Sequence, residues 1–237
     1  TIFDLLKPTS ETKTAAIPES QLLKDANGYG VLSAIEWSDN NRHILLKQVL
    51  ASGKTAFIVF DREEPTQTIN ISAKLGLKDT SQVVLRDKKY DKFYVYEPAV
   101  GTITIAETKT GLQPKPIIAG AVAFKTYADD LVMYVTYPID KPSEATVRVL
   151  SNQTDTYTLQ SVVRDPNARY QLDIARYDDN WYYVASSSAD KKVFLYRDPL
   201  SKAKPSNTTP ITPRLALLLN NPQFVSFSDN ARFIGMQ

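Results

Sequence analysis

A repeated unit of short strands constrains this chain more than any other feature of its sequence. Residues 225–234, VSFSDNARFI, align without a gap with residues 35–44, IEWSDNNRHI, at an offset of 232 − 42 = 190 residues. Residues 174–181 fit the same frame, and second strands are predicted to begin near positions 42, 92, 131, 181 and 232. The sequence therefore predicts several copies of one small β-unit.

The clearest copy of the unit occupies residues 31–72. Strands are predicted at 34–37, 42–50, 55–60 and 66–71, where apolar, β-branched and aromatic residues alternate or cluster. Between these strands lie segments rich in Asp, Asn, Ser, Gly and Pro, which close tight turns. Four antiparallel strands joined by short turns make one sheet with two faces, and such a sheet needs neighbours to cover it.

Degraded copies of the unit follow at 82–119, 121–163 and 170–219, with fourth strands predicted at 115–119, 157–163 and 211–219. Residues 1–17 match the back half of the unit, because an FD pair and a proline keep the spacing that they have in the clearest copy. Residues 223–237 match its front half. The remaining two segments could thus make up one further unit.

Four strands recurring at roughly 40 to 50 residues are typical of β-propeller blades. We therefore predict an all-β fold, a single β-propeller domain of residues 1–237 with five four-stranded blades. The N- and C-terminal strands, 1–17 and 223–237, are expected to share the closing blade. The alternative is a segment cut from a larger propeller, in which the two ends would not meet.

Composition and charge exclude several classes of partner. The 28 basic and 26 acidic residues nearly cancel, so we expect no binding to nucleic acid or to an anionic membrane surface. The absence of cysteine excludes disulfides and cysteine-ligated zinc. No apolar run approaches the roughly 18 residues of a membrane span, so membrane attachment would need a segment outside this chain. Because the chain starts with Thr1, we expect it to be an excerpt or processed piece of a longer protein. We also expect this domain to be monomeric.

The turn between the first two strands resembles a known repeat. The segments WSDNNRHI at 37–44 and FSDNARFI at 227–234 are similar to the aromatic-Ser-Pro-Asp-Gly turn of WD-like propeller repeats of the bacterial Tol-associated periplasmic type, without the proline and with asparagine replacing glycine. The overall sequence pattern also resembles propeller regions of bacterial surface proteins that carry PEGA modules. The resemblance implies a propeller at an extracytoplasmic or cell-surface location in a bacterium. It implies no particular activity, because propellers host unrelated functions.

No residue pattern predicts catalysis, a cofactor or a metal site. His43 is the only histidine and has no matched nucleophile, so we interpret it as an ordinary surface or half-buried residue. The acidic turns at Asp39, 129–130, 178–179 and Asp229 are interpreted as turn chemistry. Their alternatives are calcium ligands or a carboxylate pair for glycoside hydrolysis. We therefore assign no catalytic, cofactor-binding or metal-binding residues.

Aromatic residues provide the candidates for binding. Most of the 13 tyrosines are expected to pack between blades. Tyrosine and tryptophan that stay exposed can make stacking surfaces for sugars or peptides. We select Tyr90, Tyr127, Tyr177 and Trp181 as candidate binding residues.

These observations predict a non-enzymatic binding or structural module of an exported or cell-surface bacterial protein, with a protein or a glycan as ligand. The alternative is a propeller-type glycosidase or lyase with an acidic site in a central funnel. Acids near the first strands, such as Glu36, Asp165 or Asp173, would then supply the catalytic groups. A scaffold inside the cytoplasm is a third hypothesis.

Overall fold

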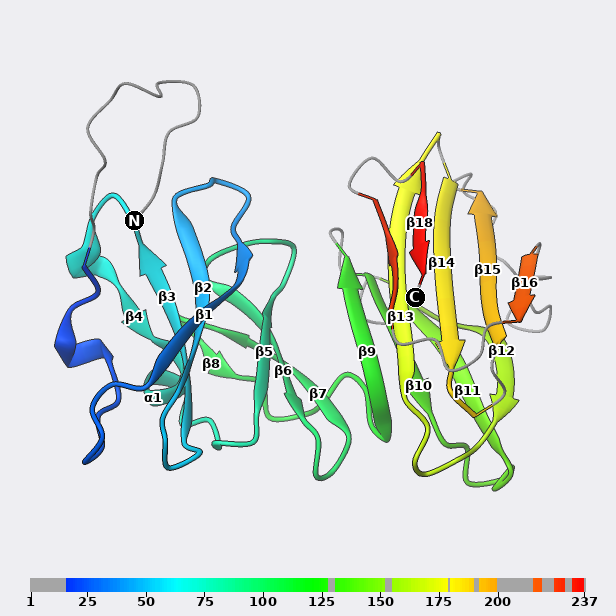
Figure 1. The fold of residues 1–237 in the computed structure, drawn as a ribbon, viewed down its shortest axis with the longest axis horizontal. Coiled ribbons are helices and arrows are strands. Elements are labelled where there is room, and N and C mark those ends of the chain that lie inside the picture. The colour runs from blue at the N-terminus through cyan, green and yellow to red at the C-terminus, as the bar shows by residue number, and fades with distance from the viewer. Residues whose placement is uncertain are drawn as a thin grey trace. The chain divides into compact units, whose positions relative to one another are not determined.

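The fold consists almost entirely of β-strands (Figure 1). The computed structural model describes residues 16–127, 131–151, 155–178, 180–189, 192–199, 215–218, 224–228 and 232–236. Helices in these residues are the 3-10 turns η1 (Glu19–Gln21) and η2 (Pro65–Gln67) and the single-turn helix α1 (Ile71–Leu75). None of the helices there has the length and apolar character needed to cross a membrane.

Four sheets of four strands repeat along the chain, each with its strands in sequence order. The first contains β1 (Val31–Trp37), β2 (His43–Val49), β3 (Thr55–Asp61) and β4 (Ile69–Asn70), and the second contains β5 (Gln82–Leu85), β6 (Lys92–Glu97), β7 (Thr102–Glu107) and β8 (Gly111–Leu112). The third contains β9 (Ala121–Tyr127), β10 (Leu131–Thr136), β11 (Glu144–Ser151) and β12 (Asp155–Val163). The fourth contains β13 (Tyr170–Tyr177), β14 (Asn180–Ser187), β15 (Lys192–Pro199) and β16 (Leu215–Leu218).

The predicted fold class, an all-β β-propeller, is confirmed. Each sheet is an up-and-down blade, and first strands of consecutive blades pack together: β1 with β5, and β9 with β13. The described residues contain four complete blades, whereas five were predicted. β17 (Val225–Phe227) and β18 (Ile234–Met236) make a two-stranded sheet whose first strand packs on β13. The other two strands of that blade were predicted within 1–17, which lies almost wholly outside the described residues, so the shared closing blade stays a prediction.

Contacts group the blades into two compact units, residues 1–99 with 104–116 and residues 100–103 with 117–237. Leu45, Phe57 and Phe93 belong to the core of the first unit. Met133 and Tyr196 belong to the core of the second. Nearly all of β3 is buried, which explains why its sequence TAFIVFD is apolar without alternation. The prediction of a single domain is not tested by these contacts and stays a prediction.

The gapless sequence match corresponds to one repeated hairpin geometry. In the β1–β2 hairpin the Ser38 N–H donates to the His43 carbonyl at 3.0 Å, and the His43 N–H donates to Ser38 Oγ at 3.2 Å. In the β17–β18 hairpin the Ser228 N–H donates to the Phe233 carbonyl at 2.9 Å, and the Phe233 N–H donates to Ser228 Oγ at 3.1 Å. The serine after the aromatic residue therefore closes both turns in the same way.

The fourth strands of the first two blades differ most from the prediction, whereas β12 covers the predicted strand 157–163. The predicted strand 66–71 is largely replaced by η2, a two-residue β4 and α1. The Asn70 side chain caps α1 by accepting the Ala73 N–H, and Gly76, at φ 64, ends it in the left-handed conformation. In the second blade the fourth strand is β8, not 115–119, of which only Ile118 forms an isolated bridge, to Ile103. β16 lies within the predicted 211–219.

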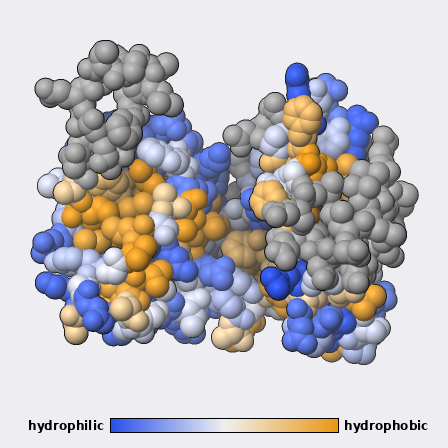
Figure 2. Space-filling view, viewed as in Figure 1, coloured by the Kyte–Doolittle hydropathy of each residue, from blue (hydrophilic) through white to orange (hydrophobic). Residues whose placement is uncertain are grey.

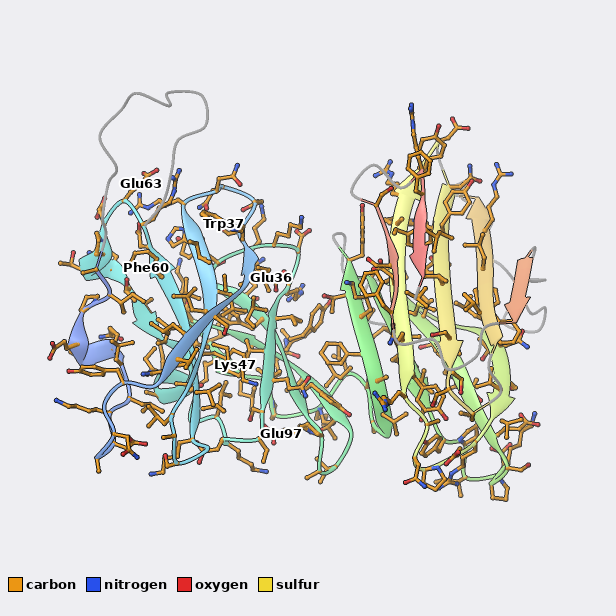
Figure 3. The ribbon with its side chains drawn as sticks, in the orientation of Figure 1. Glu36, Trp37, Lys47, Phe60, Glu63 and Glu97 are labelled. Carbon is orange, nitrogen blue, oxygen red and sulfur yellow. The ribbon has the colours of Figure 1, made fainter. Side chains whose placement is uncertain are left out.

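β1 is the most exposed strand of the first unit. Val31, Leu32, Ile35 and Trp37 each have exposed fractions of 40% or more. Figure 2 shows apolar residues gathered on the same face of this unit, and Figure 3 places Trp37 beside Glu36 on the strand. Trp37 therefore contributes less to the core than an enclosed aromatic residue such as Phe93, which is fully buried.

Candidate functional site

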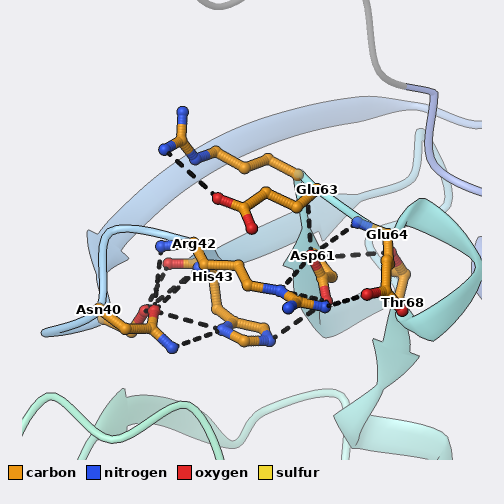
Figure 4. Close-up of polar contacts among 9 residues, drawn as sticks. Asn40, Arg42, His43, Asp61, Glu63, Glu64 and Thr68 are labelled. Carbon is orange, nitrogen blue, oxygen red and sulfur yellow. Dashed lines mark hydrogen bonds and ion pairs between the residues drawn. The ribbon is translucent and has the colours of Figure 1, made fainter.

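A buried carboxylate organises the turn end of the first blade (Figure 4). Asp61, at the end of β3, has an exposed fraction of 1% and accepts hydrogen bonds from Arg42 Nε at 2.9 Å and Arg42 Nη2 at 2.5 Å. The backbone N–H groups of Glu63 and Glu64 donate to the same carboxylate at 3.0 and 2.9 Å. Burial alone would raise the pKa of Asp61, but these four donors outweigh it and lower the pKa to about 2. The hydrogen bond to Asp61 in turn raises the pKa of Arg42.

His43 belongs to this network and lies next to one of the aromatic candidates. Its Nε2 is 3.5 Å from Asp61, its Nδ1 is 3.1 Å from the Asn40 side-chain amide, and its ring stacks on Tyr90 with centroids 3.9 Å apart. The Ser38 hydroxyl lies 2.6 Å from Asn40 Oδ1 and 3.0 Å from the His43 carbonyl oxygen. When a histidine activates a serine as a nucleophile, the serine hydroxyl instead forms its hydrogen bond with the imidazole ring. This arrangement stabilises the turn, and Tyr90 covers the histidine.

The other three aromatic candidates belong to the second unit, at the turn ends of its strands. Tyr127 is the last residue of β9, Tyr177 is the last residue of β13, and Trp181 is the second residue of β14. The rings of Tyr127 and Trp181 meet edge to face, with centroids 5.2 Å apart and an interplanar angle of 82°. Sequence reasoning therefore named residues that the fold brings to one end of the unit.

Two arginines extend over these rings. Arg176 lies 5.8 Å from the centroid of the Trp181 ring, and Arg232 lies 5.9 Å from the centroid of the Tyr177 ring. Guanidinium groups at this distance are attracted to the negative face of an aromatic ring. Both arginines are exposed, Tyr177 has an exposed fraction of 40%, and the other two rings are half-buried. We call these five residues the aromatic–arginine ledge: Tyr127, Arg176, Tyr177, Trp181 and Arg232.

The hairpin that carries most of the ledge is held rigidly. β13 and β14 pair along their whole lengths and are joined by a two-residue turn, in which Asp178 has φ 47. Asn180, buried behind the turn, donates to the Asp178 carbonyl and accepts from Arg197 Nε at 2.9 Å. The strand pairing and the hydrogen bonds of Asn180 thus fix the backbone from which three of the ledge side chains extend.

The acids named for an enzymatic site each have a structural partner. Asp173, buried on β13, accepts from the Phe227 N–H at 2.7 Å and the Ser226 hydroxyl at 2.9 Å, and it pairs with Lys125 at 3.2 Å. The Glu36 carboxylate accepts the Leu85 N–H, which joins β1 to β5. The Asp165 carboxylate accepts the Asn167 N–H at 2.8 Å. These three acids therefore link neighbouring strands or close turns.

Sequence reasoning did not select the two arginines of the ledge. A signal for Arg232 was present, because it occupies the same place in the repeat as Arg42. Arg176 had no such signal, since only the pairing of β13 with β14 sets it across from Trp181. Within the described residues, no group of three or more histidine, aspartate or glutamate side chains is arranged to hold a metal ion.

The fold and the ledge together define a β-propeller that presents one exposed and two half-buried aromatic rings, with two exposed arginines, at the turn ends of the strands of its second unit. No family model matches the chain, and no curated protein matches it in sequence. One similar solved structure is a triple arginine-to-alanine mutant of AofleA from Arthrobotrys oligospora, with 9% identity and a TM-score of 0.48 over 87% of this chain. This chain spans 64% of the length of that protein.

A second similar structure is the β-propeller domain of the Trilobed protease from Pyrococcus furiosus, described as having an open velcro topology. Its identity is 10% and its TM-score 0.39, over 84% of this chain and 76% of that one.

Proposed function

We propose that this chain is a non-enzymatic binding module of an exported or cell-surface bacterial protein, and that the aromatic–arginine ledge binds a glycan. The observation that carries the proposal is the convergence of Tyr127, Tyr177 and Trp181 with two exposed arginines at one end of the second unit. Flat aromatic rings pack against the apolar C–H faces of pyranose rings, and guanidinium and phenol groups donate hydrogen bonds to sugar hydroxyls.

The size of the ledge favours a glycan over a protein ligand. A standard protein–protein interface buries about 800 Å² on each partner and uses about 20 to 30 residues a side. The ledge consists of five side chains: three on the β13–β14 hairpin, one at the end of β9 and one shortly before β18. A few sugar rings would cover such a surface, whereas a folded partner would need contacts well beyond it.

The partners of the candidate acids support a binding role over an enzymatic one. Retaining and inverting glycosidases need two carboxyl groups facing the scissile bond, one of which must give or take a proton. Asp173 is instead occupied by Lys125 and by the backbone of β17. A hydrolysis screen against polysaccharides tests this part of the proposal, and turnover that disappears in the Asp173→Ala variant would contradict it.

The proposed location is supported by the resemblance of the turns at 37–44 and 227–234 to periplasmic propeller repeats. The sequence that flanks this segment in its gene provides the test. We expect an export signal or a surface anchor there, and a full-length gene with neither would favour the cytoplasmic scaffold instead.

A glycan array tests the binding function directly. We expect the intact chain to bind at least one saccharide, and Trp181→Ala and Tyr177→Ala to weaken that binding by tenfold or more. Tyr90→Ala is a matched control, because Tyr90 has an exposed fraction of 41%, close to the 40% of Tyr177, but lies in the first unit. Thermal melts of all variants separate lost binding from lost folding. Equal losses in the control and the ledge variants would contradict the assignment of the site.

A further inference from the structure

We infer that the ledge contains two quasi-equivalent binding positions at successive blade junctions, which together hold one extended β-linked polysaccharide. This inference rests on the proposed function and specifies its ligand. It follows from the way in which the blades of the second unit repeat one contact.

The repeated contact joins the last residue of one first strand to the opening of the next blade's second strand. Tyr127 ends β9 and contacts Trp181 at the start of β14. Tyr177 ends β13 and contacts Arg232, which precedes β18 by two positions. In the repeat frame, Trp181 and Arg232 occupy the same place, because residues 174–181 align with residues 225–232. The same two positions of the repeat are therefore in contact at two successive blade junctions.

The two positions differ in chemistry. The first, formed by Tyr127, Trp181 and Arg176, presents two half-buried rings edge to face with a guanidinium above one of them. The second, formed by Tyr177 and Arg232, is more exposed and has one ring and one guanidinium. Both combine a stacking face with hydrogen-bond donors, so both suit the same kind of sugar ring. The first has two rings, and both also pack against the core of the second unit.

The order of the strands fits a ligand made of repeated units. β13 packs against both β9 and β17, and each position lies at one of these two contacts. A chain of β-linked pyranoses with equatorial bonds is extended and shows flat C–H faces along its length, so one chain can contact both positions. Linking two weak sites through one ligand raises affinity by 10² to 10⁴ without any new contact.

The test compares short and long ligands by titration calorimetry on the intact chain. The probes are cellobiose and chitobiose, each with its hexasaccharide. We expect one disaccharide of the two to bind weakly with two molecules per chain, and its hexasaccharide to bind at least tenfold more tightly with one. Trp181→Ala and Tyr177→Ala should each reduce the disaccharide stoichiometry from two to one and abolish the advantage of the hexasaccharide. The Trp37→Phe variant leaves Trp181 as the only tryptophan, and a change in its fluorescence on binding reports on the first position.

Three results would overturn the inference. A disaccharide stoichiometry of one in the intact chain, with one variant inactive at both ligand lengths and the other unchanged, would leave the proposed function intact but reduce the ledge to one site. Array binding restricted to α-linked or branched saccharides would keep the glycan function and reject the extended β-linked ligand. No binding to any saccharide on the array would reject both, and would make a protein ligand the better hypothesis.

Discussion

Asp61 is the residue on which the polar network of the first blade depends. It is buried, and its carboxylate receives two donors from Arg42 and two from the backbone N–H groups of Glu63 and Glu64. Replacing it with Asn removes the charge that pairs with Arg42 and turns an amide group toward existing donors. We expect Asp61→Asn to lower the free energy of unfolding by about 3 kcal/mol or more. Urea denaturation at pH 7 measures the loss.

The same variant should change the response to acid. Because the pKa of Asp61 is lowered to about 2, its contribution to stability is complete above the ordinary aspartate value of 3.8 and is lost as the pH falls toward 2. Asp61→Asn should therefore flatten the fall in stability over that interval. Glu63→Gln is the control, since the Glu63 side chain is largely exposed and should stay within about 0.5 kcal/mol of the original chain. Similar losses in the two variants would contradict this account.

His43 gives a second pH dependence at milder acidity. Burial lowers its pKa, and this effect outweighs the attraction of Asp61. A histidine that stays neutral in the fold contributes stability above its ordinary pKa of about 6.5, and that contribution is lost as the pH falls below this value. Since the chain has one histidine, we expect stability to fall between pH 7 and pH 5 and His43→Gln to remove most of this slope. Urea midpoints at pH 7, 6 and 5 test this, and an unchanged slope in the variant would contradict it.

At the scale of single residues, the sequence identified aromatic residues as binding candidates because exposed tyrosine and tryptophan can make stacking surfaces. Of Tyr127, Tyr177 and Trp181, Tyr177 is exposed and the other two are half-buried, and their role in binding stays a prediction. The sequence did not show that Tyr90 would stack on His43, because that contact joins the turn of one blade to a strand of another. Nor did it show that the Asp173 carboxylate would accept a hydrogen bond from β17, because that contact also joins two different sheets. Contacts between blades depend on pairings that a local pattern does not encode.

At the scale of elements, Asp173 attaches the β17–β18 hairpin to the fourth blade. Its carboxylate accepts the Phe227 N–H and the Ser226 hydroxyl from β17 and pairs with Lys125 from β9. We expect Asp173→Asn to lower the free energy of unfolding by roughly 2 to 4 kcal/mol and to speed hydrogen exchange in β17 more than in β10. Asp178→Asn, on an exposed turn, is the control. Equal exchange in β17 for both variants would show that the carboxylate does not hold the hairpin.

The entry into β1 depends on a glycine. Gly30 has φ +67, and a Cβ there would lie 2.8 Å from the Leu50 Cα and closer still to the Val49 carbonyl oxygen. Gly53 has φ +84 but open space around its missing Cβ. Both substitutions to alanine incur the cost of a left-handed residue, about 1 to 2 kcal/mol, and Gly30→Ala adds a clash with backbone. We expect Gly30→Ala to cost at least about 1 kcal/mol more than Gly53→Ala in thermal or urea unfolding, and equal costs would contradict the close approach.

The first three strands of each blade were predictable, whereas the fourth strands were predictable only in the third and fourth blades. Inner strands such as β3 are apolar along their length because both faces are covered, which is a strong signal. In the first two blades the fourth strand lies at the edge of its sheet and is only two residues long, so local preferences decide its structure. At residues 70–76 those preferences were readable, since Asn70 and Gly76 are a helix cap and a helix stop. In the second blade, Ile118 was placed in a strand but makes only a bridge.

At the scale of the whole molecule, the repeat predicted the class of fold but not the number of complete blades. The match of residues 225–234 with residues 35–44 follows from local turn chemistry that each hairpin reproduces on its own. Completing a further blade instead requires strands from distant parts of the chain to pair, and such pairing depends on loop closure and on surfaces outside the repeat. The periodicity of the sequence therefore predicts the four-stranded blade but does not determine the number of blades.

Each compact unit has a core of its own. Leu45, Phe57 and Phe93 belong to the core of the first unit, and Met133 and Tyr196 belong to the core of the second. A unit with its own core can unfold as one cooperative transition. We therefore expect each unit to unfold in a single step.

The two tryptophans can follow the two units separately, because Trp37 lies in the first unit and Trp181 in the second. Trp181→Phe leaves a reporter in the first unit, and Trp37→Phe leaves one in the second. Each substitution keeps an aromatic ring, so both should affect stability little. We expect the fluorescence of each single-tryptophan variant to change in one two-state step with urea, because each reporter lies in a unit with its own core. A curve with two resolved steps in either variant would mean that the unit carrying that tryptophan does not unfold cooperatively.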